Sequence, residues 1–269
     1  GSLTKVLNET LKKFPEFNKA TKIFLYEKSK FLTNIQKKEI KDKKIKWIKN
    51  FKKIKGPIIF FGNEFFDAIP IKQFKRDNGL LLEKYFFIDK NFRIYERYKK
   101  ANKRDAKNIE NFKSLENLKF IEYPKLGLEE LKKIVKKVTI LKGSILLIDY
   151  GYLKPNNQNT LQSIFKHKKN NIFKNLGDAD ITSHVNFKLI EEFLINNKLN
   201  VKNIITQKEF LERMGILHRA EIISKKMKFS EQSDLYLRLK RLLNPNLMGR
   251  LFKVILAFNH KTKDYFGFK

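Results

Sequence analysis

Hydrophobic and polar positions follow two different periods along the first half of the chain. Helical spacing, with apolar residues three and four apart, covers 3–14 up to Pro15 and recurs over 31–40. Short apolar runs predict strands at 23–26, weakly at 45–47, and strongly at 57–61 and 143–148. Alternation of helices with such strands is typical of βαβ units, so we expect a mostly parallel sheet.

The region between the two strong strands has a period of two, which predicts antiparallel strands. Asp77-Asn78-Gly79 is a typical hairpin turn, and Asp89-Lys90-Asn91 indicates a second one. We therefore expect a β-rich insertion over 71–123, followed by a helix over 128–141. The rest is mainly helical: helices are expected at 187–196, 207–213, 217–227 and 234–243, with a last strand at 251–258.

Acidic or amide residues follow three of the predicted strands. These residues are Glu27, the pair Asn63-Glu64, and Asp149. Ligands of open α/β sheets bind beyond the carboxyl ends of the strands, so we expect these side chains to surround one pocket. Taken singly, each of them is weak evidence, because acids at strand ends are commonly solvated loop residues.

Glu27 suits a nucleoside ligand, because a carboxylate after the second strand can accept hydrogen bonds from both ribose hydroxyls. Such a site needs a glycine-rich loop some 20 residues earlier. Gly1-Ser2-Leu3 has the composition expected for the end of that loop, although Gly1-Ser2 could also be a cloning scar.

Two further segments carry candidate chemistry. In the segment 62–70, Glu64 and Asp67 follow a buried strand and could form a polar cluster, while Asn63 could also cap a helix. In the segment 177–184, two acids stand close to His184. Asp180 or Thr182 could cap a helix there. No second histidine stands at a ligand spacing, so we expect no metal site.

The formal net charge is +31, which suits an anionic partner such as nucleic acid or an acidic membrane surface. Lysines are spread along the chain rather than gathered in one arm, and Lys, Asn, Ile and Phe share A/T-rich codons. We therefore expect no specific nucleic-acid partner. The chain has no cysteine and no apolar run long enough for a transmembrane helix.

Several stretches together resemble the MidA family, which is related to the mitochondrial protein-arginine methyltransferase that assists assembly of respiratory complex I. The matching stretches are Asn63-Glu64-Phe65-Phe66-Asp67-Ala68-Ile69-Pro70 with Gln73-Phe74, Ile148-Asp149-Tyr150-Gly151-Tyr152, Thr160-Leu161-Gln162 with His167, Gly177-Asp178-Ala179-Asp180-Ile181-Thr182-Ser183-His184-Val185, Thr206-Gln207 with Glu209-Phe210-Leu211, and Pro245 with Met248-Gly249 and Leu251-Phe252-Lys253-Val254. Asn186 departs from the family, which usually has Asp there.

The resemblance implies a class I methyltransferase fold over 1–269, α/β with a Rossmann-like sheet, and S-adenosyl-L-methionine as cofactor. It implies methylation of arginine on a protein, such as a respiratory complex I subunit, in a bacterial-type cytoplasm or a mitochondrial matrix. The resemblance leaves open whether the chain forms a homo-oligomer. The site residues it implies are Glu64, Asp67 and His184 for catalysis, and Gly1, Glu27, Asn63 and Asp149 for the cofactor.

The family's cofactor loop reads Glu-x-Gly-x-Gly-x-Gly, and only Gly1-Ser2-Leu3 matches its end. We therefore expect the first strand and most of this loop to be missing, and this chain alone to be poorly stable and inactive. Two other readings stay open: a non-catalytic assembly factor on the same fold, and a polyanion-binding protein driven by charge.

Overall fold

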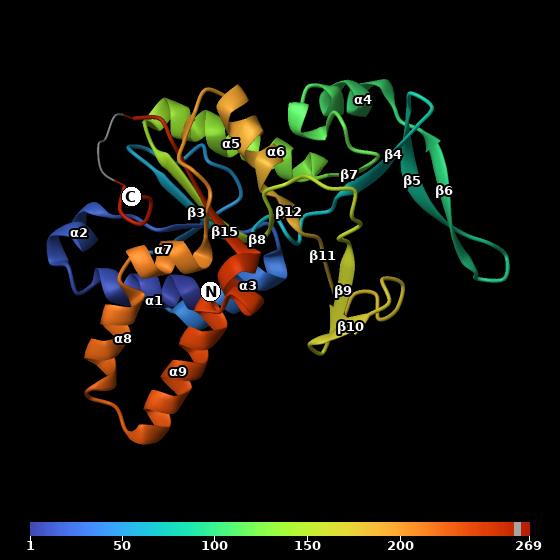
Figure 1. The fold of residues 1–269 in the computed structure, drawn as a ribbon. Helices are drawn as coiled ribbons and strands as arrows, with labels where there is room; N and C mark the ends of the chain where they lie inside the picture. The colour runs from blue at the N-terminus through green and yellow to red at the C-terminus, as the bar shows by residue number, and fades with distance from the viewer. Residues whose placement is uncertain (261–264) are drawn as a thin grey trace. The chain divides into compact units, whose positions relative to one another are not determined.

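The structure, a computed structural model, describes residues 1–260 and 265–269. These residues form two compact units, Gly1–Lys55 and Gly56–Lys269, each of which is described by itself (Figure 1). None of the described helices is long and apolar enough to cross a membrane.

The first unit is a small α/β unit. Its elements are α1 (Ser2–Leu11), α2 (Pro15–Ala20), β1 (Phe24–Tyr26), α3 (Lys30–Ile40) and β2 (Lys46–Ile48). β1 and β2 pair in parallel, as their predicted place in a βαβ unit requires. The first predicted helix ends three residues early, and Pro15 instead begins α2, where its missing N–H costs nothing.

The second unit is built on a six-stranded sheet. Its strands are β3 (Ile59–Asn63), β8 (Ser144–Tyr152), β12 (Val185–Asn186), β13 (Asn200–Val201), β14 (Ile205–Thr206) and β15 (Phe252–Phe258). β3 and β12 pair in parallel with β8, whereas β15 pairs with β8 in antiparallel direction, as β13 and β14 do with β15. The sheet is therefore mixed, and the expectation of a mostly parallel sheet was wrong.

The helices of this unit are α5 (Lys125–Leu141), α6 (Phe187–Asn196), α7 (Gln207–Arg213), α8 (Ile216–Ser224) and α9 (Phe229–Leu243), with a short turn η2 (Pro245–Gly249) before β15. α5 packs on β3 and β8, and α6 packs on β8 and β15. Side chains of β8 alternate between buried and half-buried, which places this strand at the centre of the core.

The region 71–123 contains the antiparallel strands that the sequence predicts. The strands β4 (Lys72–Asp77), β5 (Leu80–Ile88), β6 (Ile94–Lys100) and β7 (Phe120–Tyr123) form a sheet in the order β6-β5-β4-β7. Asn78 and Gly79 both have positive φ, as a tight two-residue hairpin turn requires. The sequence did not predict α4 (Lys103–Glu110) or the 3₁₀ turn η1 (Lys113–Leu115) between β6 and β7.

A small sheet that the sequence did not predict follows β8. It contains β9 (Gln162–Phe165), β10 (Lys168–Asn170) and β11 (Asp180–Thr182), with β9 in the middle. Because Asp180 and Thr182 lie in β11, the idea that either caps a helix was wrong. Asn186 is the cap of α6, and its Oδ1 accepts from the backbone N–H of Leu189 at 3.1 Å. Asn and Asp are comparably good caps, which accounts for the departure at this position.

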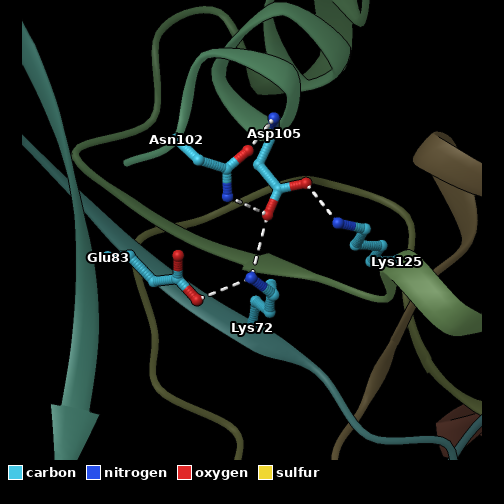
Figure 2. Close-up of polar contacts among 5 residues, drawn as sticks. All are labelled: Lys72, Glu83, Asn102, Asp105 and Lys125. Carbon is cyan, nitrogen blue, oxygen red and sulfur yellow. Dashed lines mark hydrogen bonds and ion pairs between the residues drawn. The ribbon is translucent and has the colours of Figure 1, made fainter. Parts of the chain in front are cut away.

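A buried ion cluster ties the antiparallel sheet to α4 and α5. Figure 2 shows Asp105 between two lysines: its Oδ2 lies 2.9 Å from Lys72 Nζ and its Oδ1 lies 2.7 Å from Lys125 Nζ. Lys72 also pairs with Glu83 at 2.7 Å, and Asn102 donates to Asp105 at 2.8 Å. Burial alone would raise the pKa of Asp105, but the hydrogen bonds from Lys125 and Lys72 lower it to about 2.

Candidate functional site

The turn that follows β3 is the centre of the candidate site. β3 ends at Asn63, and Glu64 has a φ of 50°, a left-handed conformation that is uncommon for a residue with a side chain. The N–H of Glu64 donates to Ile148 O at 2.9 Å, and Asn63 Nδ2 donates to Glu64 Oε1 at 3.2 Å. Both side chains are exposed, so they are free to meet a ligand.

Asp149 holds this turn from the neighbouring strand. Its Oδ2 accepts from the N–H of Phe65 at 3.0 Å and of Phe66 at 2.8 Å, and its Oδ1 accepts from the N–H of Tyr150. β8 continues to Tyr152, so Asp149 lies within the strand and is only 2% exposed. The expectation that Asp149 ends its strand was therefore wrong, because pairing with β12 and β15 extends β8 beyond it.

The environment of Asp149 favours its protonated form. Burial raises the pKa of Asp149 to about 7, and the negative charge of Asp67 adds to this, while the backbone N–H groups act in the opposite direction. Strongly shifted carboxyl pKa values cluster at functional sites.

Asp67 is the second buried carboxylate of the site. Tyr150 donates its hydroxyl hydrogen to Asp67 Oδ2 at 2.7 Å. Asp67 Oδ1 is buried and has no hydrogen-bond partner among the described residues, which is costly unless a ligand or water satisfies it. Burial is the main cause that raises the pKa of Tyr150 above its ordinary value, and the Asp67 contact adds to it, so Tyr150 stays a donor.

These residues line an open groove of about 550 Å³ within the second unit. Glu64, Asp67 and Tyr150 form its wall on the sheet side, and Asp180 and Thr182 of β11 line it together with Gln162 of β9. Three carboxylates thus converge on one groove in a chain whose net charge is +31. Such a groove favours a cationic group.

His184 lies next to this groove but does not line it. Its ring packs edge-on against the Tyr150 ring, with 5.6 Å between centroids. Burial lowers the pKa of His184 below its ordinary value. His184 instead lines a small cavity of about 20 Å³ with Glu122 and Phe66.

Glu122 is a site residue that the sequence did not reveal. Its Oε1 accepts from Gln73 Nε2 and from the N–H of Thr160, both at 3.0 Å. Its Oε2 accepts from Thr160 Oγ1, and this hydroxyl oxygen in turn accepts from the N–H of His184 at 2.9 Å. Glu122 therefore joins three stretches that the family resemblance singled out. Gln73 and Thr160, which belong to the family motifs, could have indicated such a residue in the sequence, because buried amides and hydroxyls need a polar partner.

Gly1 and Glu27 belong to the first unit, where both lie beside Gln36. Gln36 Nε2 donates to Glu27 Oε2 at 3.1 Å, and a Cβ at Gly1 would lie 3.5 Å from Gln36 Cγ. Glu27 Oε1 also accepts from the N–H of Ser29 at 2.8 Å. The expectation that Glu27 shares a pocket with Asn63, Glu64 and Asp149 concerns residues of two units and stays a prediction.

Among the described residues, no three histidine, cysteine or acidic side chains gather in a way that could hold a metal ion. Asp178, Asp180 and His184, which are close in sequence, do not form such a group. Asp180 lies in β11 and lines the groove, whereas the N–H of Asp178 donates to Asn175 O in the preceding turn.

Residues 1–205 match the family described as "Putative S-adenosyl-L-methionine-dependent methyltransferase". A curated relative is the mitochondrial protein arginine methyltransferase NDUFAF7 homolog of Caenorhabditis elegans, 27% identical over 225 residues, which cover 82% of this chain and 52% of that protein. The human protein arginine methyltransferase NDUFAF7 is 24% identical over 219 residues, which cover 81% of this chain and 49% of that protein. The chain thus spans about half the length of the curated relatives it matches.

Two solved structures from Burkholderia thailandensis share the fold. One is described as a "likely methyl transferase" bound to S-adenosyl-homocysteine; its TM-score is 0.73 at 19% identity, covering 91% of this chain and 66% of that one. The other is an uncharacterized protein with a TM-score of 0.67 at 20% identity, covering 83% of this chain and 60% of that one. At these identities the likeness concerns the fold alone.

Proposed function

Because this chain belongs to that family of S-adenosyl-L-methionine-dependent methyltransferases, as its resemblance to the MidA family indicated, we propose that it serves the transfer of a methyl group to an arginine side chain of a protein. The cofactor of the family is the one expected from the sequence, S-adenosyl-L-methionine. The proposal concerns the whole protein, since the chain covers only part of its relatives' length.

The acidic groove is the observation that carries the proposal. Glu64, Asp67 and Asp180 present carboxylates to the same space, although basic residues outnumber acidic ones by 59 to 28 in the chain as a whole. A guanidinium is a planar cation with five N–H donors, and carboxylates are its best acceptors. The unpartnered Oδ1 of Asp67 is one acceptor that such a group would satisfy.

The chemistry of arginine explains why several acids are useful. The guanidinium is protonated at every physiological pH, and its lone pairs are delocalised. We assign Glu64 and Asp67 to orienting the group, so that one nitrogen faces the methyl donor and the positive charge is held on the others. A proton must leave after transfer, and an exposed carboxylate such as Glu64 can accept it. His184 acts on this site through its contact with Tyr150.

The chain also has residues that suit the cofactor. S-adenosyl-L-methionine supplies an activated methyl group on a sulfonium. Glu27, which Gln36 and the N–H of Ser29 hold in place after β1, is assigned to the ribose hydroxyls. Gly1 is assigned to close approach of the backbone at the start of α1. Asn63 is assigned to a direct contact with the cofactor, and Asp149 is assigned to holding the turn that carries Asn63 and Glu64.

The substrate class rests on the relatives, which are named mitochondrial protein arginine methyltransferases. We propose that this chain also acts on a protein substrate, and a subunit of respiratory complex I is the candidate. Its location would then be a mitochondrial matrix or a bacterial-type cytoplasm. Nothing in the acidic groove requires a second copy of the chain.

The test is methyl transfer from radiolabelled S-adenosyl-L-methionine to arginine-containing peptides, followed by amino-acid analysis of the product. In the full-length protein, Glu64→Gln should lower kcat about 100-fold, as loss of one charge-stabilising group typically does, and leave cofactor affinity unchanged. Glu116→Gln, on an exposed residue outside the groove, is the matched control and should keep full activity.

Label on lysine rather than arginine would contradict the substrate class. Normal turnover of the Glu64→Gln protein would remove Glu64 from the mechanism. Cofactor binding without any transfer, in the presence of a candidate substrate protein, would favour the alternative of a non-catalytic assembly factor.

A further inference from the structure

The hairpin of β5 and β6 is a prominent feature that the proposed function does not use. The two strands pair from Leu82↔Lys100 to Ile88↔Ile94, and the loop 89–93 joins them. In Figure 1 this hairpin extends away from the central sheet of the second unit. None of its residues lines the acidic groove.

The tip of the hairpin exposes three large apolar side chains next to the polar residues of its loop. Phe92 is 88% exposed and Ile88 is 66% exposed, with Ile94 opposite Ile88. The loop is nevertheless ordered by hydrogen bonds: Asp89 Oδ1 accepts from the N–H of Asn91 at 2.9 Å and of Arg93 at 2.8 Å. The loop therefore presents a large ring to solvent, close in sequence to the exposed side chains of Ile88 and Ile94.

Cations and aromatic rings lie directly behind the tip. The register places Phe87 opposite Tyr95, and Tyr85 opposite Arg97, so these side chains share one face of the hairpin. Arg97 lies 5.5 Å from the Phe87 ring centre and 5.0 Å from that of Tyr95. Lys99 lies 4.9 Å from the Phe87 ring centre on the same face.

The hairpin carries a net positive charge. Between residues 82 and 100 there are six lysines and arginines and three acids. All three acids are engaged, because Glu83 pairs with Lys72, Asp89 binds backbone N–H groups of the loop, and Glu96 pairs with Lys84 at 2.5 Å. Three of the remaining cations, Arg97, Lys99 and Lys100, lie on β6, which is the outer strand of its sheet.

We propose that this hairpin binds the surface of an anionic lipid membrane, with Ile88, Phe92 and Ile94 entering the headgroup region. The residues along the hairpin fit this environment: the three apolar side chains stand at the tip beside Lys90 and Arg93, and tyrosines alternate with further basic residues behind it. Tyrosine and basic side chains are the groups that anchor proteins at the membrane interface, and each basic residue near an anionic leaflet contributes attraction. The attachment would be peripheral and reversible.

Single-stranded nucleic acid fits these observations less well. Bases would stack on open aromatic faces, but Arg97 and Lys99 already lie over Phe87 and Tyr95. Phe92 is an open ring, but the isoleucines beside it offer no stacking surface, whereas burial in an apolar medium stabilises all three side chains.

The test is cosedimentation of the full chain with vesicles of phosphatidylcholine, with and without a quarter of phosphatidylserine. We expect binding only to the anionic vesicles, weakened by salt. The double variant Ile88→Ser/Phe92→Ser should lower the partition coefficient at least tenfold. Arg97→Gln/Lys99→Gln should also lower it at least tenfold, since each charge near the surface contributes about fivefold.

Matched controls separate the effect of the hairpin on vesicle binding from the effects of net charge and of exposed rings elsewhere. Phe229→Ser removes another ring, 84% exposed, and Lys132→Gln/Lys136→Gln removes two exposed lysines from α5. Both should bind vesicles like the unchanged chain, and all variants should keep its circular dichroism spectrum.

Equal losses in the controls and in the hairpin variants would overturn the proposal, because general charge would then explain the binding. So would equal binding to neutral and anionic vesicles. Binding of polyuridylate that the hairpin variants abolish, with no vesicle binding, would overturn it in favour of single-stranded RNA.

Discussion

At the scale of single residues, the acids of the second unit differ in what surrounds them. Glu64 is exposed and in a left-handed conformation, which the chain tolerates because neighbouring backbone groups are held by Ile148 and Asp149. Asp149 is buried among backbone N–H groups, and Asp67 is buried with one oxygen unpartnered. These different environments support the proposal that Asp149 positions the turn, whereas Glu64 and Asp67 contact the substrate.

Asp149 should make stability depend on pH. Its pKa is raised from 3.8 to about 7 in the folded chain, so the folded state holds this proton more tightly than the unfolded state. The protonated Asp149 therefore stabilises the fold fully below about pH 4, and this stabilisation is lost as pH rises to about 7. Each unit of pKa difference between the folded and unfolded states corresponds to about 1.4 kcal/mol of unfolding free energy.

Urea unfolding of the unchanged chain and of Asp149→Asn across this range measures the effect. The difference in unfolding free energy between the unchanged chain and Asp149→Asn should change between pH 4 and 7 and be constant above pH 7. Asp178→Asn, on an exposed residue, is the control and should show no such window. A difference that does not vary with pH would contradict the raised pKa.

Tyr150→Phe should destabilise the chain by about 1–3 kcal/mol, because Asp67 would lose its hydroxyl partner while staying buried. The ring contacts with His184 and Phe252 would remain. Tyr236→Phe is the control, since the Tyr236 side chain is exposed. Chemical denaturation compares the two variants, and equal stabilities would show that Tyr150 does not support Asp67.

At the scale of elements, β8 organises the second unit. It pairs with β3 and β12 along one edge and with β15 along the other, and Asp149 and Tyr150 come from its second half. Gly151 permits this arrangement, because a Cβ there would lie 2.0 Å from Val185 O of β12. The site therefore depends on a close approach between two strands as well as on its own side chains.

The ion cluster of Figure 2 gives a prediction for the antiparallel sheet. Asp105 is fully buried, so Asp105→Asn would leave Lys72 and Lys125 without their shared partner. Removing one member of a buried pair costs about 3–5 kcal/mol, and the partly exposed lysines should place this cost at or below the lower end.

Asp77→Asn, which breaks the exposed pair with Lys75, should cost less than about 1 kcal/mol. Thermal or urea unfolding measures both variants. Because the pKa of Asp105 is lowered to about 2, its contribution is present above about pH 4 and is lost as pH falls toward 2. Equal costs for Asp105→Asn and Asp77→Asn would show that the cluster does not stabilise the sheet.

At the scale of the whole molecule, the most prominent property of the chain is its net positive charge. A charge of +31 on 269 residues implies repulsion within the folded chain, and the acidic groove is a local exception to it. The charge is spread along the sequence, so screening should act on the chain as a whole rather than on one patch.

Added sodium chloride should therefore raise the melting temperature, by roughly 2–4 °C for each kcal/mol of repulsion that it screens. Differential scanning calorimetry at rising salt measures the change. The variant Lys132→Gln/Lys136→Gln should respond slightly less, since two charges are gone. A melting temperature that falls with salt would show that attractive pairs outweigh the repulsion.

The sequence by itself determined the elements whose signals are local. α6 and α7 have the predicted bounds, because Asn186 caps one and Thr206 forms a capping box with Glu209 in the other. The turn at Asn78-Gly79 was equally readable, since two adjacent positive φ angles favour this pair. The family motifs pointed to the turn after β3 and to its acids for the same reason: each lies within a few consecutive residues.

Only the tertiary structure decided which distant residues meet. The antiparallel direction of β15, the strands β9 to β11, and the burial of Asp149 depend on pairing partners far along the chain. Glu122 became part of the site only when Gln73, Thr160 and His184 came together around it. Periodicity and capping act within a few residues, whereas burial and strand pairing depend on groups that the sequence separates by dozens of positions.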